Sequence, residues 1–342
     1  MKNRNFAMGL AAGLGAAWAA GRLARTRHAI SFDGRVVVLT GGSRGLGLVM
    51  ARMLVDEGAK LVLLARDLSE LERAREDLET SGRGEVMTIR CDVRRRADVR
   101  AAIDTVLDQW RSVDVLINNA GVIQVGPLEH MTEEDFENAM ATHFWGPLHL
   151  ILEIAPVMRH RRFGRIVNIA SIGGKIAVPH LAPYCASKFA LTGLSDAVRA
   201  ELDPYGIRVT TVAPGLMRTG SALNAQFKGK HEAEYAWFKI SSSIPGLTVA
   251  AERAARQILD ACRYGDPALT ITPHARIAAA ANVVAPAAVA RAMMLVARAL
   301  PAPGGPEGNV LKKGLESEAK SRWTPSVVTA LTDNAAIANN EL

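Results

Sequence analysis

Cysteine is scarce in this chain, whose 342 residues include only Cys91, Cys185 and Cys262. None of them forms a Cys-x-x-Cys motif, and none has histidine partners at the spacing of a metal site. This pattern indicates neither a disulfide framework nor a zinc site, and we expect no bound metal. Reduced thiols in a cytoplasmic compartment are the expected state.

Acidic residues are absent from positions 1–32, which hold five Lys and Arg residues and therefore +5 of the formal net charge of +7. The rest of the chain carries only +2. Because the positive charge flanks an apolar segment and does not cover a folded face, nucleic-acid binding is not supported.

That apolar segment, residues 6–21, has only 16 residues without a charge. As a helix it would extend about 24 Å, less than the ~30 Å of a hydrocarbon core, although flanking arginines can lengthen its reach. Three interpretations stay open: a membrane anchor that leaves the catalytic domain in the cytoplasm, a surface-lying helix or disordered arm, and a signal peptide cleaved after the small residues around Ala19. We favour the anchor.

The composition of the remaining chain is that of a folded domain, since the whole sequence is 49% hydrophobic and 22% charged. From residue 34 to 273, short β-like apolar runs alternate with helical stretches. The strand candidates are 35–40, 60–65, 86–90, 114–117, 165–170, 207–212 and 268–271. This alternation predicts an α/β fold: a single Rossmann-type, doubly wound parallel sheet of about seven strands with helices on both faces.

The domain boundaries follow from breaks in composition. We expect an N-terminal apolar and basic segment over 1–32, a catalytic domain over 33–273, and a helical extension with a polar tail over 274–342. The extension is predicted from an alanine-rich run at 277–300, which Pro286 interrupts and a Pro/Gly-rich stretch ends.

A glycine-rich turn follows the first predicted strand. Residues 40–47 have the sequence Thr-Gly-Gly-Ser-Arg-Gly-Leu-Gly, and a helical stretch begins directly after them. Glycine lets backbone N–H groups approach a pyrophosphate, and the helix dipole stabilises its negative charge. We therefore expect a nucleotide cofactor, bound here by Thr40, Gly41, Ser43, Arg44, Gly45, Leu46 and Gly47.

Two arginines favour one of the two nicotinamide cofactors. An acidic residue at the end of the second strand would bind the ribose 2′-hydroxyl of NAD, whereas arginine accommodates the 2′-phosphate of NADP. The second predicted strand ends in Ala65 and Arg66, and the glycine turn contains Arg44. We expect NADP(H).

Ser171, Tyr184 and Lys188 are the residues expected to carry the chemistry. Tyr184 and Lys188 are four residues apart in a stretch, 183–202, that is predicted to be helical, so they share one face. A nearby ammonium stabilises phenolate and is expected to lower the tyrosine pKa from about 10 toward neutrality. Ser171 lies at the exit of the predicted strand 165–170, where parallel sheets place their sites.

The same Tyr/Lys spacing occurs a second time, at Tyr235 and Lys239. No serine stands at the matching position upstream of Tyr235. We expect this second pair to be structural.

Taken together, these motifs resemble the short-chain dehydrogenase/reductase family over roughly residues 34–273. The shared motifs are Thr40–Gly47, Cys91-Asp92-Val93, Asn118-Asn119-Ala120-Gly121, the set Ser171, Tyr184 and Lys188, and Pro214-Gly215 with Thr219. The resemblance implies contacts to adenine, to the two riboses and to the carboxamide. The further cofactor residues that it implies are Asp92, Val93, Asn119, Ala120, Gly121, Tyr184, Lys188, Pro214, Gly215, Met217 and Thr219.

One position departs from the family pattern. His143 stands where the family usually has an asparagine that helps to hold a water near the lysine. Pro147 has no N–H to donate to the carbonyl of His143, so that oxygen is free for a water whatever the side chain is. His143 either takes part in proton transfer or replaces the asparagine passively.

The expected function is NADP(H)-dependent oxidoreduction, with hydride moving between nicotinamide and a carbonyl or secondary alcohol. The alternative is a non-catalytic NADPH-binding scaffold or redox sensor, which only the missing asparagine supports. The segment 220–247 is expected to close over the site, and its apolar residues favour a lipid-derived or alicyclic ketone. By the same resemblance, a homo-oligomer would pair through the helices over 132–160 and 183–205.

Overall fold

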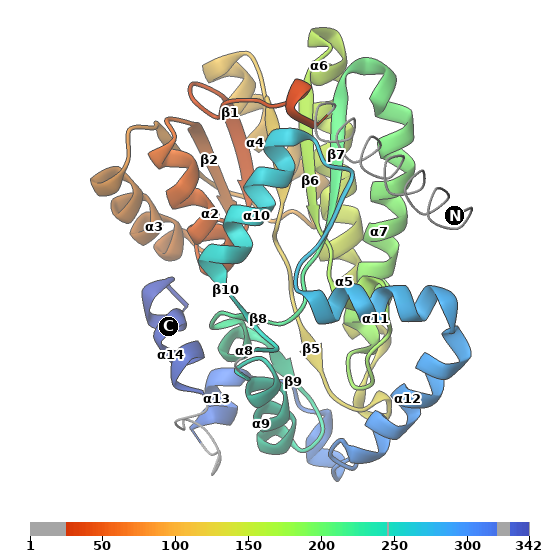
Figure 1. Ribbon diagram of the computed structural model, residues 1–342. Coiled ribbons are helices and arrows are strands. Elements are labelled where there is room, and N and C mark those ends of the chain that lie inside the picture. The colour runs from red at the N-terminus through yellow and green to blue at the C-terminus, as the bar shows by residue number, and fades with distance from the viewer. Residues whose placement is uncertain (1–24, 245, 320–328, 342) are drawn as a thin grey trace, which may run out of the picture.

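The centre of the protein is a parallel sheet of seven strands in the order β11-β7-β6-β4-β1-β2-β3 (Figure 1). The structure is a computed structural model that describes residues 25–244, 246–319 and 329–341. The strands are β1 (Val36–Thr40), β2 (Lys60–Ala65), β3 (Val86–Arg90), β4 (Val115–Asn118), β6 (Gly164–Ile169), β7 (Ile207–Ala213) and β11 (Ala268–Thr270). Each predicted strand agrees with these bounds to within one residue at either end.

Alternation along each strand distributes apolar side chains to both faces of the sheet. In β1, Val37 and Leu39 belong to one buried cluster, whereas Val36 and Val38 belong to the other. Strands that are covered on both sides must be apolar on both faces, which is why they appear in the sequence as continuous apolar runs.

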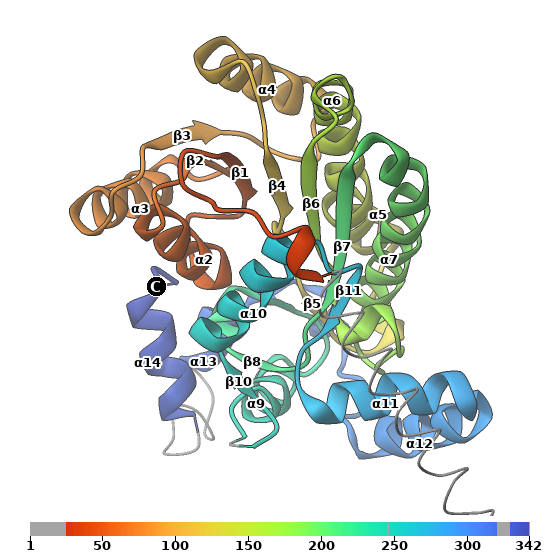
Figure 2. The same ribbon diagram turned by 45° about the horizontal axis from the view of Figure 1, so that its top comes forward.

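Helices cover the two faces in layers. Residues of α2 (Gly45–Asp56), α3 (Leu68–Ser81) and α10 (Ala251–Tyr264) join the first cluster. Residues of α4 (Arg96–Trp110), α6 (Gly146–Arg161) and α7 (Ala182–Leu202) join the second. Figure 2 shows these layers on opposite sides of the sheet, and the predicted doubly wound fold is confirmed.

The helical stretch before β6 contains a local irregularity. It consists of α5 (Glu133–Met140), a π-helical turn (Ala141–Trp145) and α6, and Pro147 lies in the first turn of α6. Within the turn, the N–H of Gly146 donates to the carbonyl of Ala141, five residues earlier. Such π-turns are typical of functional sites, and this one contains His143.

Short elements gather at the carboxyl edge of the main sheet. One small sheet has the order β12-β9-β5, with β5 (Gln124–Val125), β9 (Gln226–Phe227) and β12 (Lys312–Lys313), and another pairs β8 (Met217–Arg218) with β10 (Val249–Ala250). The helices there are α8 (Ser221–Asn224), α9 (His231–Ser241), α13 (Gly314–Glu318) and α14 (Ala330–Ala338). Sequence analysis missed these strands because a strand of two residues has no periodicity to detect.

The alanine-rich run forms two helices, α11 (Pro273–Val284) and α12 (Pro286–Ala299), which are separated at Pro286 as expected. Nearly all side chains of both helices are at least partly exposed. The apolar segment 6–21 lies outside the described residues, and within those residues no helix is long and apolar enough to cross a membrane. The division into 1–32, 33–273 and 274–342 stays a prediction.

Candidate active site

The candidate site lies at the carboxyl edge of the sheet, where β1, β4, β6 and β7 all end. β1 lies between β4 and β2. From β1 the chain continues to β2 and β3 on one side, and it then crosses to β4 on the other side of β1. In doubly wound sheets, ligands bind at such a switch point. The glycine turn, Asn119, Ser171 and Pro214 therefore come to one edge.

The glycine turn after β1 has the shape of a phosphate cradle. Gly41 and Gly45 have φ angles of +63° and +56°, which favour glycine. A Cβ at Gly47 would lie 2.0 Å from the carbonyl oxygen of Gly41, so the packing at this position excludes any side chain.

The end of β4 supports this turn. The Nδ2 of Asn119 donates to the carbonyls of Thr40 at 3.1 Å and Gly41 at 3.0 Å. In return, Thr40 Oγ1 accepts the N–H groups of Asn119 and Ala120 at 2.9 and 3.0 Å. The residues implied to contact the adenosine ribose thus also fix the shape of the turn.

A carboxyl group lies at the end of this turn. The carboxyl group of Glu341 lies beside Gly45: a Cβ built on Gly45 would be 2.9 Å from its Oε1. A carboxyl oxygen thus reaches the N-terminus of α2, the kind of helix end at which a nucleotide phosphate binds.

The two arginines expected at the adenosine end are placed differently. Arg44 is paired with Glu70 at 2.7 Å, and Glu70 also accepts a hydrogen bond of 2.9 Å from Ser43 Oγ. Arg66 is exposed and lies, with Asp92, along a pocket of about 560 Å³. Sequence analysis missed Glu70, whose only signal is its place in the first turn of the helix after β2.

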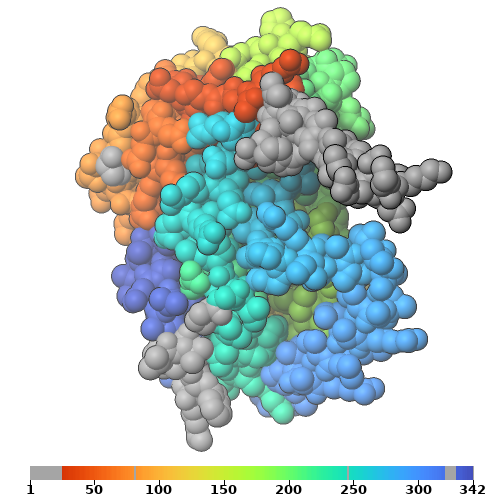
Figure 3. Space-filling view, in the orientation of Figure 1, coloured from red at the N-terminus to blue at the C-terminus, as the bar shows by residue number. Residues whose placement is uncertain are grey.

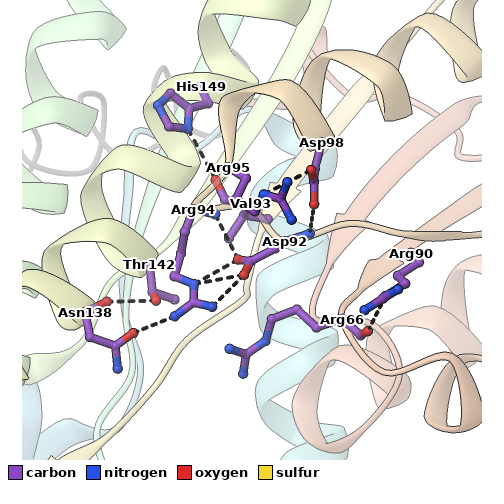
Figure 4. A network of polar contacts seen from close by, with 10 residues as sticks. All are labelled: Arg66, Arg90, Asp92, Val93, Arg94, Arg95, Asp98, Asn138, Thr142 and His149. Atoms are coloured by element: carbon purple, nitrogen blue, oxygen red, sulfur yellow. Dashed lines mark hydrogen bonds and ion pairs between the residues drawn. The ribbon is translucent and has the colours of Figure 1, made fainter.

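Asp92 is engaged by a neighbouring arginine. The guanidinium group of Arg94 donates to both carboxylate oxygens of Asp92, at 2.6 to 3.0 Å, and Figure 4 shows Arg66 extending beneath this pair. Burial opposes ionisation of Asp92, but the hydrogen bonds and charge of Arg94 outweigh it and lower the pKa. Val93 beside it is buried, and its carbonyl accepts a hydrogen bond from His149 at 3.3 Å.

Ser171, Tyr184 and Lys188 meet at the exit of β6. The hydroxyl of Tyr184 lies close enough to Ser171 for that side chain to act against the rise of its pKa. The Lys188 ammonium donates to the carbonyl of Ile169 at 2.8 Å and lies 5.7 Å from the centre of the Tyr184 ring. The spacing of four residues on α7 thus places both groups beside the last residues of one strand, as predicted.

The electrostatics of this trio differ from the expectation. Burial raises the pKa of Tyr184 to about 12, against a smaller lowering by the hydrogen bond from Ser171. Burial lowers the pKa of Lys188 to about 7. The expected fall of the tyrosine pKa is therefore not seen, because both groups lose hydration and the lysine is turned to a backbone carbonyl.

His143 is fully buried and both of its ring nitrogens are engaged. Nε2 accepts the N–H of Val122 at 3.2 Å, so the ring proton is on Nδ1, which lies 2.8 Å from Ser187 Oγ. Ser187 in turn donates to the carbonyl of Tyr184. Burial, and then the charge of Lys188, lower the pKa of His143 well below its ordinary value. These contacts favour the passive alternative.

The segment after β7 completes the edge. The carbonyl of Pro214 accepts the N–H of Ile172 at 2.8 Å, which ties this segment to the residues after Ser171. A Cβ at Gly215 would lie 2.7 Å from Thr272 Oγ1, and Met217 begins the strand paired with β10. Thr219 is buried, and its hydroxyl accepts the N–H of Ser221.

The segment 220–247 forms α8, β9 and α9 and packs beside Tyr184. Ala222, Leu223, Phe227 and Phe238 are buried in one apolar cluster, and Tyr184 packs against its edge. Much of the apolar character that suggested a lid is therefore used for packing. Ile123, Val178 and Trp237 are partly buried at the edge of the same cluster.

Comparison with known proteins agrees with this geometry. The family model for short chain dehydrogenases matches residues 35–228. A 3-ketodihydrosphingosine reductase of Bacteroides thetaiotaomicron is 36% identical over 201 residues, 58% of this chain and 71% of that protein. An uncharacterized oxidoreductase of Mycobacterium tuberculosis is 34% identical over 262 residues, 75% of this chain and 72% of that protein.

Solved structures show the same fold. L-sorbose reductase from Gluconobacter frateurii, in complex with NADPH and L-sorbose, has a TM-score of 0.64 and 25% identity, covering 71% of this chain and 97% of that chain. Levodione reductase has a TM-score of 0.61 and 28% identity, covering 70% and 96%. The sequence match, the doubly wound sheet and the Ser171, Tyr184 and Lys188 arrangement agree, and the chain belongs to the short-chain dehydrogenase/reductase family of oxidoreductases.

Proposed function

We propose that this protein is an NADP(H)-dependent reductase of apolar ketones. The observation that carries the proposal is the placement of Tyr184 beside Ser171 and Lys188, at the sheet edge that also holds the glycine turn. When bound, the nicotinamide would supply or accept the hydride. The residues that would hold it are those of the glycine turn, Asn119 and the segment Pro214–Thr219.

The protonation state of Tyr184 supports reduction. With a pKa of about 12, its hydroxyl keeps its proton at neutral pH and can donate it to a carbonyl oxygen that gains negative charge. Ser171 is placed to orient and polarise the same oxygen. Lys188 lies beside the ring of Tyr184 and is expected to bind the ribose and to return the tyrosine to its protonated form.

Two observations support NADP(H) over NAD(H). Arg66, and not an acidic residue, directly follows the end of β2, and Arg44 lies in the glycine turn. The L-sorbose reductase neighbour is a complex with NADPH. We therefore expect Arg66 to bind the 2′-phosphate.

The surroundings of Tyr184 support an apolar substrate, since Ile123, Val178 and Trp237 lie at the same cluster edge. The relative named 3-ketodihydrosphingosine reductase points to a lipid-like ketone, whereas the neighbour with L-sorbose points to a polar one. NADPH and NADH oxidation measured with cyclohexanone, decan-2-one, a long-chain 3-ketone and L-sorbose separates these cases. NADPH-linked turnover of the long-chain ketone is expected. Failure to turn over any carbonyl despite NADPH binding would support the scaffold alternative.

We also propose that residues 6–21 associate with a membrane, with the catalytic domain in the cytoplasm. Support comes from the uncharged run between basic flanks. The full chain is expected to sediment with membranes and to resist a high-salt wash, whereas a chain beginning at Ser31 stays in the supernatant and still binds NADPH. Recovery of the intact full chain in the supernatant would refute this proposal.

A homo-oligomer is proposed through α5, α6 and α7. Support comes from three large apolar side chains of this part of the chain, Trp145, Leu152 and Phe189, which are 49%, 50% and 43% exposed and could pack against a second copy. Light scattering of the chain that begins at Ser31 is expected to give the mass of a dimer or tetramer. Substituting Phe189 with Glu should shift that mass to the monomer.

A further inference from the structure

Residues 338–341 lie against the outer side of the glycine turn, far from it in sequence. Arg52 of α2 donates to the carbonyl of Ala338 at 2.9 Å and to the side chain of Asn339 at 2.8 Å. The side chain of Asn340 donates to the carbonyl of Ser43 at 2.9 Å. Figure 3 shows these last residues, in violet, against the orange surface of the first third of the chain.

The contacts reach the backbone N–H groups of the phosphate cradle. The N–H of Gly45, the first residue of α2, donates to the carbonyl of Asn339 at 2.8 Å. The N–H of Gly220, directly after Thr219, donates to the carboxyl group of Glu341 at 2.5 Å. Glu341 is only 8% exposed. One short segment thus holds donors from both sides of the candidate cofactor site.

These positions are the ones that a pyrophosphate would need. In folds of this kind, the pyrophosphate lies at the N-terminus of the helix after the glycine turn, where backbone N–H groups and the helix dipole stabilise its charge. The carboxyl group of Glu341 places an oxygen at the same helix end. While this carboxyl group lies beside Gly45, a phosphate oxygen cannot occupy the same position.

We propose that residues 339–341 compete with the cofactor for the phosphate cradle, with the Glu341 carboxyl group in the place of a cofactor phosphate. Binding of the cofactor then requires these residues to leave, so their docking free energy sets the cofactor affinity. Glu341 is an affinity-determining residue of the site. The inference rests on the proposed function, because it assumes a pyrophosphate cofactor.

The electrostatics around Glu341 make the docking sensitive to pH. Burial raises the pKa of Glu341 from 4.5 to about 7; the N–H of Gly220 and the charge of Arg44 act against this shift, and the charge of Glu70 adds to it. Arg44 compensates poorly because it is already paired with Glu70. The docked segment binds a proton more tightly than the released one. Docking is therefore strongest below about pH 4.5 and weakens as the pH rises to about 7.

The first experiment measures NADPH affinity by fluorescence titration of the intact chain, of Glu341→Ala, and of a chain that stops after Ala338. Both changes are expected to tighten binding about fivefold or more, the lower end of the usual range for coupled sites. Glu316→Ala is the matched control, since Glu316 is exposed on α13. It should leave the affinity unchanged. Equal or weaker binding by both altered chains would overturn the proposal.

The second experiment follows the affinity across pH. The ratio of the dissociation constants of the intact chain and of Glu341→Gln cancels the titration of the cofactor itself. This ratio is expected to change between about pH 5 and 7 and to be constant above about pH 8. A ratio that is constant throughout would contradict a role for the Glu341 carboxyl group.

Hydrogen exchange gives a readout that does not depend on affinity or turnover. Addition of NADPH should speed the exchange of amides in residues 336–341 and slow that of the glycine turn. Slower exchange in both would mean that the segment clamps the cofactor, and would overturn the competition. Absence of NADPH and NADH binding by every form would overturn the proposed function and this inference together, whereas equal binding by all forms would overturn this inference alone.

Discussion

The protein contains the same local motif in two helices, and only one copy has the surroundings of an active site. Tyr184 and Lys188 on α7, and Tyr235 and Lys239 on α9, are each four residues apart. The lysine nitrogen lies 5.7 Å from the ring centre in the first pair and 5.4 Å in the second. Each tyrosine also has a ring edge-on at 5.5 Å, that of His143 or of Phe227.

The two pairs differ in the acids around them. Lys239 forms ion pairs with Glu318 and, at 2.6 Å, with Asp333. The hydroxyl of Tyr235 donates to Glu318 at 2.8 Å, and burial together with these carboxylates raises its pKa. Lys188 donates to a backbone carbonyl, and the neighbour that acts on the hydroxyl of Tyr184 is Ser171, which carries no charge.

This difference shows that a spacing of four residues on a helix brings a tyrosine and a lysine close together but does not determine their protonation. Carboxylates neutralise the second pair and tie α9 to α13 and α14. In the first pair, burial without a carboxylate leaves a lysine that titrates near neutral pH and a tyrosine that keeps its proton. The expectation that Tyr235 and Lys239 are structural agrees with these contacts.

The largest difference between the two pairs is expected when the hydroxyl group of each tyrosine is removed. Tyr184→Phe is expected to lower turnover about 10²–10⁴-fold, the usual contribution of a general acid, and to leave NADPH binding intact. Tyr235→Phe should leave turnover unchanged and destabilise the fold by about 1 kcal/mol through its lost hydrogen bond. Steady-state rates and urea denaturation measure both effects. Undiminished turnover of Tyr184→Phe would overturn the assigned mechanism.

Removing the two ammonium groups should change stability in opposite directions. Lys239→Met leaves Glu318 and Asp333 without their cation and is expected to cost about 3–5 kcal/mol. Lys188→Met removes a buried ammonium that has no carboxylate partner. This substitution should raise the free energy of unfolding by about 0.5–2 kcal/mol, while activity is lost. Denaturant midpoints provide the comparison, and a destabilised Lys188→Met protein would contradict it.

The stabilisation expected from Lys188→Met should decrease as the pH rises. Burial lowers the pKa of Lys188 from 10.5 to about 7, so the folded chain binds this proton less tightly than the unfolded chain. The resulting cost to stability is complete below about pH 7 and disappears as the pH rises through about 10.5. The advantage of Lys188→Met should therefore shrink between these two values.

A cofactor is expected beside Tyr184 and Lys188 but not beside Tyr235 and Lys239. Substitution of Arg66 tests which cofactor binds there. Arg66→Asp should weaken NADPH binding by about 1.5–3 kcal/mol, the scale of a charged hydrogen bond, and spare NADH. Arg100→Asp, on the exposed side of α4, is the matched control. Equal affinities of the unaltered protein for NADPH and NADH would refute the preference.

The smallest effect on turnover is expected from substituting the two rings that lie edge-on to the tyrosines. His143 has both nitrogens engaged in neutral contacts, so His143→Asn should change turnover less than about tenfold, or 1.4 kcal/mol of barrier. Its pH profile should keep its shape. Phe227→Leu is the counterpart beside Tyr235 and should affect stability alone. A tenfold or larger loss in His143→Asn with a shifted pH profile would show that the imidazole carries protons.

Local patterns in the sequence were sufficient for the main sheet and for the placement of the trio. Continuous apolar runs marked the seven strands, and the positions of Ser171 and Tyr184 after β6 followed from the rule that sites lie at carboxyl ends. The two-residue strands and the π-turn at His143 left no such pattern. The contact between Glu341 and Gly220 joins residues 121 positions apart, and nothing in the sequence pointed to it.

The sequence by itself determined which residues are near one another along the chain: the glycine turn, the spacing of Tyr184 and Lys188, and the alternation that produces a doubly wound sheet. Only the tertiary structure decided what surrounds them. It raised the pKa of Tyr184 instead of lowering it, assigned the ring proton of His143 to Nδ1, and brought Glu341 to the phosphate cradle. The physical reason is that hydration, charge and hydrogen-bond partners come from residues distant in sequence, whereas spacing along a helix or strand is local.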